Sequence, residues 1–376
     1  MKIGILTKYV LRNSSRQEMI DKLKSQGFHA DEFVFLGTVS NGYDGSFGKA
    51  DLAAARADFS EMVPSHRLDG LLAMGNEALY VSTGHSGIMK WRGQPTEANG
   101  FTVIPTIALG AIERNPSQIQ LLYADMRALY GQVYGAPRNA DAKPGRIRLI
   151  KDEPSLEQFF HDVHTADAVA YDLETKSFNE LEDGAFIVTA AFTLSHPDDS
   201  MSCWTVPLYH KSSPCKDNWD SILRRIAWEV ARVPVRVAHN AKFDCRWLVQ
   251  FNAPIPCNFD TMLAAHMLDE NRFKGLKPLA QMLLDAPPWD IPIKSGKNAP
   301  PWYTQHSLKD ILRYNAMDTW HTMRLYKIFR KQLDEDRRVA KIFDKLMMPA
   351  SQSLVHVERR GVFVHREALA KGASIA

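Results

Sequence analysis

The sequence predicts an α/β protein built from two domains. Apolar runs short enough for β-strands alternate with amphipathic helical stretches through most of the 376 residues. A stretch rich in glycine, proline and polar residues interrupts this alternation at 135–146 and is typical of a linker. With 45% hydrophobic and 24% charged residues, the composition is ordinary for a globular protein. We therefore expect an α/β domain at 1–134, a linker at 135–146 and a second α/β domain at 147–335.

The first domain is expected to alternate strands with helices. Its first residues are basic and apolar, like a signal peptide, but Lys8 and Arg12 interrupt the apolar run and no small-residue cleavage site follows. A first strand is therefore the better interpretation. The expected strands are Ile3–Leu6, Glu32–Leu36, Gly70–Met74 and Phe101–Pro105, and the expected helices are Ser15–Gln26 and Pro116–Tyr130.

The second domain is expected to begin with three consecutive strands and to continue mainly as helices. Ala286–Gln305, in which proline and tryptophan recur, is not expected to form regular structure. A last segment, 336–376, should contain a helix from Phe343 onward. The expected strands are Ala166–Glu174, Ala185–Leu194, Ser202–Leu208 and Val233–Ala238, and the expected helices are Trp219–Ala231, Ala241–Phe251, Thr261–Leu268, Leu276–Leu284 and Leu308–Leu333.

Charge, apolar runs and cysteines exclude several classes of protein. A net charge of +3 gives no overall basicity, so any grip on nucleic acid must be local. No apolar stretch approaches the roughly 18 residues that a membrane-spanning helix needs. The four cysteines include no Cys-x-x-Cys pair, which argues against a disulfide framework and a structural zinc site. We expect a protein of the reducing cytoplasm without membrane contact.

Three short patches carry four acids and a tyrosine. Asp172 and Glu174 are two residues apart near the end of an expected strand, so their side chains should point to the same face. Asp244 lies four residues after Asn240, and Asp318 lies four residues after Tyr314, so each pair should share one helix face. The three elements can therefore converge at one end of a sheet.

Four carboxylates brought together in this way suit the hydrolysis of a phosphodiester. Two divalent ions about 3.5–4 Å apart can neutralise the phosphoryl oxygens and activate a water, provided that carboxylates fix their positions. Magnesium prefers oxygen ligands. The run Ala168–Ala170 before Asp172 should be a buried strand, where unpaired carboxylates would be costly without cations.

The residue sequences of the three patches resemble those of the DnaQ-like 3′–5′ exonucleases of the Asp-Glu-Asp-Asp-Tyr type. They resemble most closely the proofreading domain of bacterial and phage family A DNA polymerases. The resemblance covers about 147–333 and also includes Phe259–Ala264 and Gly275–Ala280. It implies a ribonuclease H-like fold, with a mixed five-stranded sheet flanked by helices, and two Mg²⁺ or Mn²⁺ ions. By this resemblance Asp172, Glu174, Asp244 and Asp318 bind the metals, and Tyr314 orients the attacking water.

The same resemblance suggests residues that hold the 3′ end of the substrate. Thr175 and Phe178 follow the first acids, and Phe178 is a candidate for stacking between terminal bases. Asn240 and Lys242 are expected near the strand's backbone. The loop after the second domain's helices offers Trp289, Lys294, Lys297 and Trp302 as further contacts or, equally well, as packing anchors.

The first domain has a weaker resemblance to the second half of a uracil-DNA glycosylase. This rests on Leu72–Ala78, Trp91–Gly93 and Val103–Thr106. Ile107, Ala108 and Leu109 stand where that family has an aromatic residue, histidine and proline, and the family's acid-bearing loop is also absent. We expect a non-catalytic domain that either binds DNA or polymerase through Lys90, Arg92 and Arg114 or serves as a spacer.

Leu346–Pro349 and Val357–Val364 resemble the opening of a family A polymerase domain. The resemblance predicts the exonuclease portion of a split or truncated polymerase from a phage or bacterium, with no polymerase activity of its own. The expected partners are the 3′ end of a single-stranded DNA or primer and a DNA polymerase chain. The alternatives are a ribonuclease D-like RNA exonuclease and a non-catalytic scaffold that tethers DNA or polymerase.

Overall fold

The computed structural model describes residues 2–39, 48–134, 144–270, 272–294, 296, 299–367 and 369. The chain forms two compact units. The first unit comprises Met1–Lys143 and Asn271–Asp290, and the second unit comprises Pro144–Glu270 and Ile291–Ala376. Of the expected linker, 135–143 lies outside the described residues. Within the described part of the chain, no helix is both long and apolar enough to cross a membrane.

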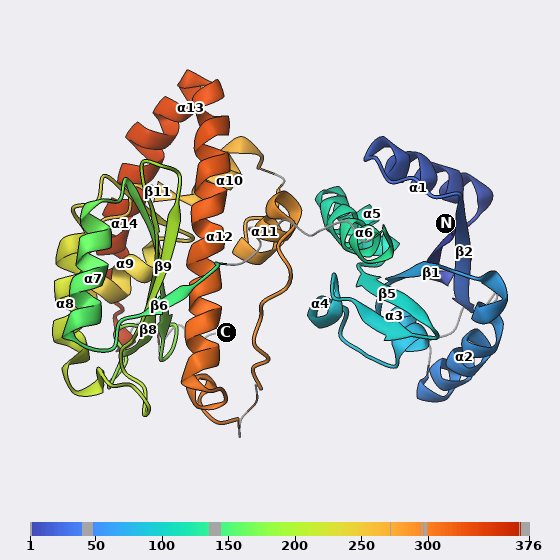
Figure 1. The fold of residues 1–376 in the computed structure, drawn as a ribbon, viewed down its shortest axis with the longest axis horizontal. Helices are drawn as coiled ribbons and strands as arrows, with labels where there is room; N and C mark the ends of the chain where they lie inside the picture. The colour runs from blue at the N-terminus through green and yellow to red at the C-terminus, as the bar shows by residue number, and fades with distance from the viewer. Residues whose placement is uncertain are drawn as a thin grey trace. The chain divides into compact units, whose positions relative to one another are not determined.

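The first unit is built on a sheet with the strand order β2-β1-β3-β5-β4 (Figure 1). Strands β1, β2, β3 and β5 are parallel, and the short β4 pairs antiparallel with β5. The strands are β1 (Lys2–Tyr9), β2 (Glu32–Val39), β3 (Gly70–Met74), β4 (Thr96–Ala98) and β5 (Phe101–Thr106). The helices are α1 (Asn13–Ser25), α2 (Lys49–Met62), α3 (Asn76–Thr83), α4 (Ile88–Trp91), α5 (Leu109–Arg114), α6 (Ile119–Tyr134) and, from the later segment, α11 (Leu276–Leu284).

A buried ion pair crosses the core of the first unit. Arg92 and Asp125 are 6% and 2% exposed, and the guanidinium donates to both carboxylate oxygens at 2.8 and 3.2 Å. A third donor, the Thr106 hydroxyl, lies 2.7 Å from the same carboxylate. Arg92 also donates to Gln281 of α11 at 2.6 Å. Arg92 is therefore a structural residue, and its predicted role in binding DNA is wrong because its side chain is buried.

The second unit is built on a mixed sheet with the order β11-β10-β7-β8-β9-β6. The expected mixed sheet flanked by helices is present, but it has six strands among the described residues instead of five: the four strands located from the sequence and the short β6 and β11 at the two edges. The strands are β6 (Ile147–Leu149), β7 (Ala168–Thr175), β8 (Ile187–Ser195), β9 (Met201–Pro207), β10 (Val235–Ala238) and β11 (Phe259–Asp260). The helices are α7 (Glu153–His164), α8 (Trp219–Val230), α9 (Lys242–Gln250), α10 (Thr261–Leu268), α12 (Leu308–Glu335), α13 (Arg337–Ile342) and α14 (Met348–Arg360).

Helices cover both faces of this sheet (Figure 1). On one face, Phe159 of α7 contacts the rings of Phe192 and Trp204 on β8 and β9. On the other face lies the 28-residue α12, whose Thr319 is hydrogen-bonded to Thr193 of β8. Strands β7, β10 and β11 are parallel, so their carboxyl ends meet at the same edge of the sheet.

Candidate active site

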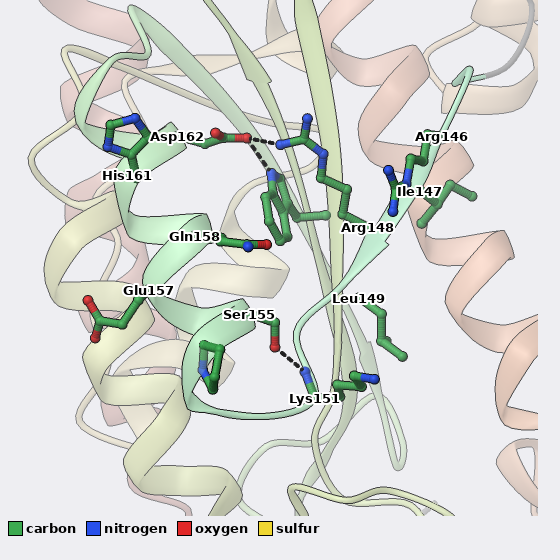
Figure 2. A pocket seen from close by; sticks show the side chains of 12 residues that line it. Arg146, Ile147, Arg148, Leu149, Lys151, Ser155, Glu157, Gln158, His161 and Asp162 are labelled. Carbon is green, nitrogen blue, oxygen red and sulfur yellow. Dashed lines mark hydrogen bonds and ion pairs between the residues drawn. The ribbon is translucent and has the colours of Figure 1, made fainter.

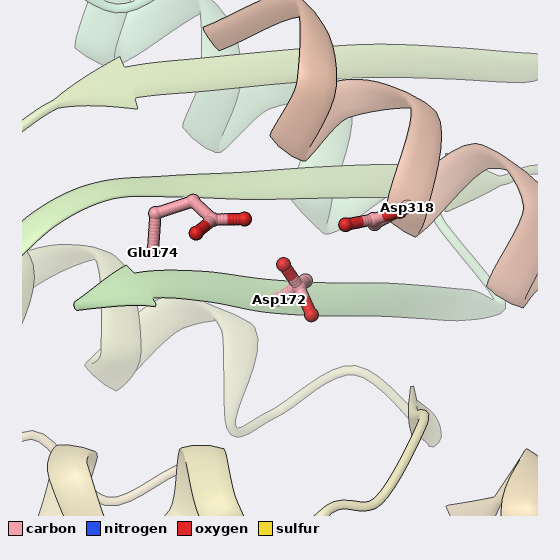
Figure 3. A group of neighbouring side chains, drawn as sticks. All are labelled: Asp172, Glu174 and Asp318. Carbon is pink, nitrogen blue, oxygen red and sulfur yellow. The ribbon is translucent and has the colours of Figure 1, made fainter. Parts of the chain in front are cut away.

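Strand β7 supplies two carboxylates near its carboxyl end. Asp172 and Glu174 alternate with the buried Leu173, so both side chains point to the face that α12 covers. The register between β7 and β8 shifts between Glu174 and Thr175, because Val188 of β8 is skipped, as in a β-bulge. A bulge increases the local twist and changes the direction of the side chains beside it. Figure 3 shows the carboxylates of Asp172 and Glu174 turned towards that of Asp318.

Helix α12 completes this group. One ligand oxygen from each of Asp172, Glu174 and Asp318 lies within 4.8 Å of the others, a spacing at which one metal ion can be held. Asn315, three residues earlier on α12, donates its amide to the Asp172 carboxylate at 2.6 Å. The same amide accepts a hydrogen bond from the hydroxyl of Thr189 at 3.0 Å. The buried Asn315 therefore connects α12 to β8 and fixes the orientation of the Asp172 carboxylate.

Asp244 approaches from α9, which follows β10. Its carboxylate accepts a hydrogen bond from the backbone N–H of Leu173 at 3.0 Å, so it lies beside β7 between the two strand acids. Beyond Ala170, β7 no longer pairs with β10, which leaves this N–H to the side chain. Asp244 is outside the three-carboxylate group but is fixed next to it.

The turn that carries α9 is held by a second buried acid. Asn240 has a left-handed backbone with φ of 62°, a conformation that asparagine tolerates better than most residues. The carboxylate of Asp260 accepts the backbone N–H groups of Asn240 and Ala241 at 3.0 and 2.8 Å. It also caps α10 by accepting the N–H of Met262. Asp260 thus joins the two loops that follow β10 and β11.

Burial and mutual repulsion make these carboxylates hard to ionise in the absence of cations. Burial raises the pKa of Asp172 well above its usual value, and the charges of Asp244, Asp318 and Glu174 raise it further. Burial also raises the pKa of Asp244 to about 8, although the hydrogen bond from Leu173 lowers it. A nearby cation would relieve both causes, since it favours the charged form.

The loop after β7 is closed by its own side chains. The Lys176 ammonium donates to the carbonyls of Asp183 and Gly184 at 3.0 and 3.1 Å. The Thr175 hydroxyl donates to the carbonyl of Ser177. At the tip of this loop Phe178 is 89% exposed, with an edge-to-face contact to Phe243 of α9. A large aromatic side chain is thus held out towards solvent near the acids.

The other predicted residues have different positions. Tyr314 lies on α12, half-buried, one turn before Asp318. Asn240 is exposed at the start of the α9 turn. Lys242 forms an ion pair with Glu358 of α14. Trp302 is a packing anchor, because its indole N–H donates to the carbonyl of Thr175 at 2.9 Å. Lys294 binds Gln305 through its backbone only, and Lys297 lies outside the described residues.

A separate cavity of about 960 Å³ lies beside the edge strand β6 (Figure 2). It is lined by residues of β6 and α7, and Asp162 there accepts hydrogen bonds from Arg148 and from the indole of Trp204 at 2.6 and 3.0 Å. The carboxylates of Asp172, Glu174, Asp244 and Asp318 do not line it. This cavity is therefore distinct from the acidic site.

Sequence reasoning missed two residues that hold the site together, Asn315 and Asp260, and it left open whether Trp302 is a strand contact or a packing anchor. Asn315 stands directly after Tyr314, and an amide in the apolar stripe of a helix was the available signal. Asp260, at the start of an expected helix, carried the signal of an N-cap. No local pattern marks the bond from Trp302 to Thr175, since the two residues are far apart in the chain.

Comparisons with known proteins agree with this geometry. Residues 147–334 match the model of the 3′–5′ exonuclease of the DNA polymerase A type. The chain is 32% identical over 233 residues to DNA polymerase I of Borreliella burgdorferi, which covers 61% of this chain and 24% of that protein. It is 25% identical over 326 residues to the DNA polymerase of Escherichia phage T5, covering 78% of this chain and 35% of the relative. The chain thus spans about a quarter to a third of the length of these relatives.

Among solved structures, Brucella melitensis NrnC aligns with 58% of this chain and 98% of its own, at 20% identity and a TM-score of 0.41. This likeness is too weak to add to the assignment. The family match covers half of the chain and includes every acid of the site. The chain belongs to the 3′–5′ exonuclease family of the DNA polymerase A type.

Proposed function

We propose that the chain removes nucleotides one at a time from the 3′ end of single-stranded DNA, with two Mg²⁺ or Mn²⁺ ions bound by Asp172, Glu174, Asp244 and Asp318. The observation that carries this proposal is the meeting of Asp172, Glu174 and Asp318 within 4.8 Å, with Asp244 beside them. Such a grouping is unfavourable for a bare protein and favourable around cations.

The donor set fits divalent ions of this kind. All four side chains offer carboxylate oxygens, the ligand type that Mg²⁺ and Mn²⁺ prefer. Exonuclease domains of this family use divalent metal ions. When bound, the ions supply charge neutralisation at the phosphate and lower the pKa of a water.

The protein's own groups then have separate tasks. Tyr314 orients the attacking water from α12, and Asn315 holds the Asp172 carboxylate in place. The water oxygen bonds to phosphorus while the bond from phosphorus to the 3′ oxygen of the preceding nucleotide breaks. The water's proton passes to solvent, the departing 3′ oxygen takes up a proton from solvent to become the 3′-hydroxyl of the shortened strand, and a nucleoside 5′-monophosphate leaves.

Exposed groups around the acids suit a single strand. Phe178 offers a ring on which the terminal bases stack, a contact that does not depend on sequence. Asn240 is exposed at the same edge of the sheet and contacts the 3′ end, and the buried Thr175 supports that edge from beneath. The relatives are DNA polymerases, which favours DNA over RNA and a role in proofreading beside a family A polymerase.

We infer that the first unit adds no base-excision activity. Ile107, Ala108 and Leu109 cannot activate a water or stabilise a leaving base. The exposed Lys90 and Arg114 remain candidates for contact with DNA or polymerase, whereas Arg92 is engaged in the core.

A nuclease assay tests the proposal. Labelled single-stranded DNA and RNA of one sequence are incubated with the protein in Mg²⁺ or in EDTA, alongside Asp172→Ala. We expect stepwise loss of nucleotides from the 3′ end of DNA, abolished by EDTA and by the substitution. Inertness of the unsubstituted protein would overturn the enzymatic proposal, and faster trimming of RNA would overturn the choice of DNA.

A further inference from the structure

Two cations on α9 grip one carboxylate of the C-terminal helix. Lys242 and Arg246, one turn apart, bind the two different oxygens of Glu358: the Lys242 ammonium contacts Oε1, and Nη1 of Arg246 lies 3.4 Å from Oε2. A phosphodiester presents two charged oxygens in a similar way, and Arg and Lys are the usual partners of both groups. The carboxylate is therefore held as a phosphate would be.

The surroundings place this pair beside the substrate groups. Lys242 lies two residues before Asp244, and Phe243, between them in sequence, touches the exposed Phe178. Behind the pair, Arg359 donates to the carbonyl of Arg246 and to Gln250 at 2.9 and 2.8 Å, which fixes the end of α14 on α9. The loop after β7 that carries Phe178, called the stacking loop below, also contains the buried Glu180. Its carboxylate lies 3.6 Å from Nε of Arg246. The stacking loop, α9 and α14 thus meet at one point.

The ion pairs that Lys242 and Arg246 form with Glu358 can be exchanged for contacts with a phosphate. The side chains of Lys242 and Glu358 are each 33% exposed, and ion pairs with this exposure contribute little net stability, about 0–1 kcal/mol. The Nε of Arg246 is buried and faces Glu180 at 3.6 Å, so Nη1, which contacts Glu358, is the donor that an incoming phosphate would take over. An incoming phosphate can replace Glu358 at small cost.

We propose that Lys242 and Arg246 form a binding site for an internucleotide phosphate of the substrate strand, and that Glu358 occupies this site until the strand enters. The inference rests on the proposed function and adds a subsite and a gate to it. Glu358 does not touch the reacting atoms; it competes with the strand for the two cations.

Strand binding distinguishes a gate from a structural brace of α14. If Glu358 is a gate, Glu358→Gln lowers the Kd of the strand, whereas removing a brace raises the Kd or leaves it unchanged. The Kd of a single-stranded oligodeoxynucleotide of about ten nucleotides is measured in EDTA over a range of NaCl. We expect Glu358→Gln to lower Kd about threefold and to steepen the slope of log Kd against log salt by about 0.7, the value for one phosphate contact that is no longer offset by the release of the Glu358 charge. Glu335→Gln, an exposed change of the same charge on α12, should alter neither.

Two further variants check that the gain comes from the cations. Lys242→Ala and Arg246→Ala should each raise Kd, and Glu358→Gln should give little gain in an Arg246→Ala background. If Glu358→Gln weakens strand binding or leaves it unchanged, Glu358 is a structural brace of α14 and the proposal is wrong.

Two small ligands serve as further tests. One distinguishes an internucleotide phosphate from a terminal phosphate, and the other tests the exonuclease proposal independently of the gate. Thymidine monophosphate has only a terminal phosphate, so Glu358→Gln should leave its Kd unchanged. If Glu358→Gln lowers the Kd of thymidine monophosphate as much as that of the oligodeoxynucleotide, the assignment to an internucleotide phosphate is wrong. Hydrolysis of the p-nitrophenyl ester of thymidine monophosphate by the unsubstituted protein tests the exonuclease chemistry by itself, because this ester has no second nucleotide to reach the gate.

Discussion

At the scale of single residues, the acidic site depends on neighbours that are not themselves acids. Asp172 could turn away from Glu174 and Asp318 by rotating about its side-chain bonds. The amide of Asn315 prevents this, and Thr189 in turn fixes the amide. Partners of metal ligands usually contribute by such orientation.

Replacing Asn315 by leucine should therefore impair metal binding more than folding. We expect Asn315→Leu to weaken the apparent Mg²⁺ affinity, measured from the Mg²⁺ dependence of DNA trimming, by about 10–100-fold. Thr319→Val is a matched control, since it removes a buried hydrogen bond between the same helix and β8. Equal effects of the two variants would show that only the packing of α12 matters.

The raised pKa of Asp244 predicts how the metal-free protein responds to pH. Because the folded-state pKa is about 8 and the unfolded value is near 3.8, the native form binds more protons than the unfolded form between these values. Stability must then fall as pH rises from about 4 to about 8. We expect the Tm in EDTA to decrease over this range and Mg²⁺ to restore most of the loss at the upper end, as followed by thermal melts. In Asp244→Asn the decrease should be smaller, and a Tm that instead rises with pH would contradict the charge arrangement.

At the scale of elements, the end of β7 is held from outside the strand. The register with β8 shifts after Glu174, and Trp302 binds the carbonyl of Thr175 just beyond the shift. The tryptophan belongs to a short 3₁₀ turn, Trp302–Thr304, directly before α12. The bond thus ties the segment leading into α12 to the strand that carries the first two acids.

Trp302→Phe keeps the ring but removes the N–H donor. Loss of one hydrogen bond of about 1 kcal/mol should lower kcat about fivefold with little change in KM, because the change alters the acids and leaves the stacking loop intact. Trp228→Phe on α8, where the side chain is 66% exposed, is the control. A rise in KM with unchanged kcat would instead place Trp302 in substrate contact.

The sequence predicted many elements closely, and the misses have physical causes. The bounds of α10 and α11 agree with the expectation, and β7 begins two residues later and ends one residue later than expected, at Thr175 beyond the register shift. Helix α7 was not expected, although Asp152 and Ser155 form a capping box at its start. Strands of two or three residues, such as β11 and β6, are too short to show a period.

At the scale of the whole molecule, the first unit depends on a buried charge pair. Asp125→Ala leaves the buried guanidinium of Arg92 unpaired, which typically costs about 3–5 kcal/mol. We expect this variant to lose that stability in a denaturant melt. The double change Asp125→Leu with Arg92→Met should be clearly milder, since no charge is then left buried. Equal losses would mean that shape, and not charge, governs this core.

The site could be predicted because its acids lie in short local patterns, two residues apart on a strand and four apart on helices. Asn315, Asp260 and Glu358 act through residues distant in sequence, and one chain without its fold does not reveal such pairings. The same reason explains Arg92, whose partners come from α6 and α11. Its charge suggested a surface contact, whereas the fold buries it.

Titration of metal-free protein with Mn²⁺ by calorimetry tests the central claim, that acids from three elements form one metal centre, most directly. We predict two Mn²⁺ ions bound per chain and loss of this binding in Asp318→Asn, with no change in Asp58→Asn, an exposed acid on α2. Unchanged Mn²⁺ binding in Asp318→Asn would contradict the account.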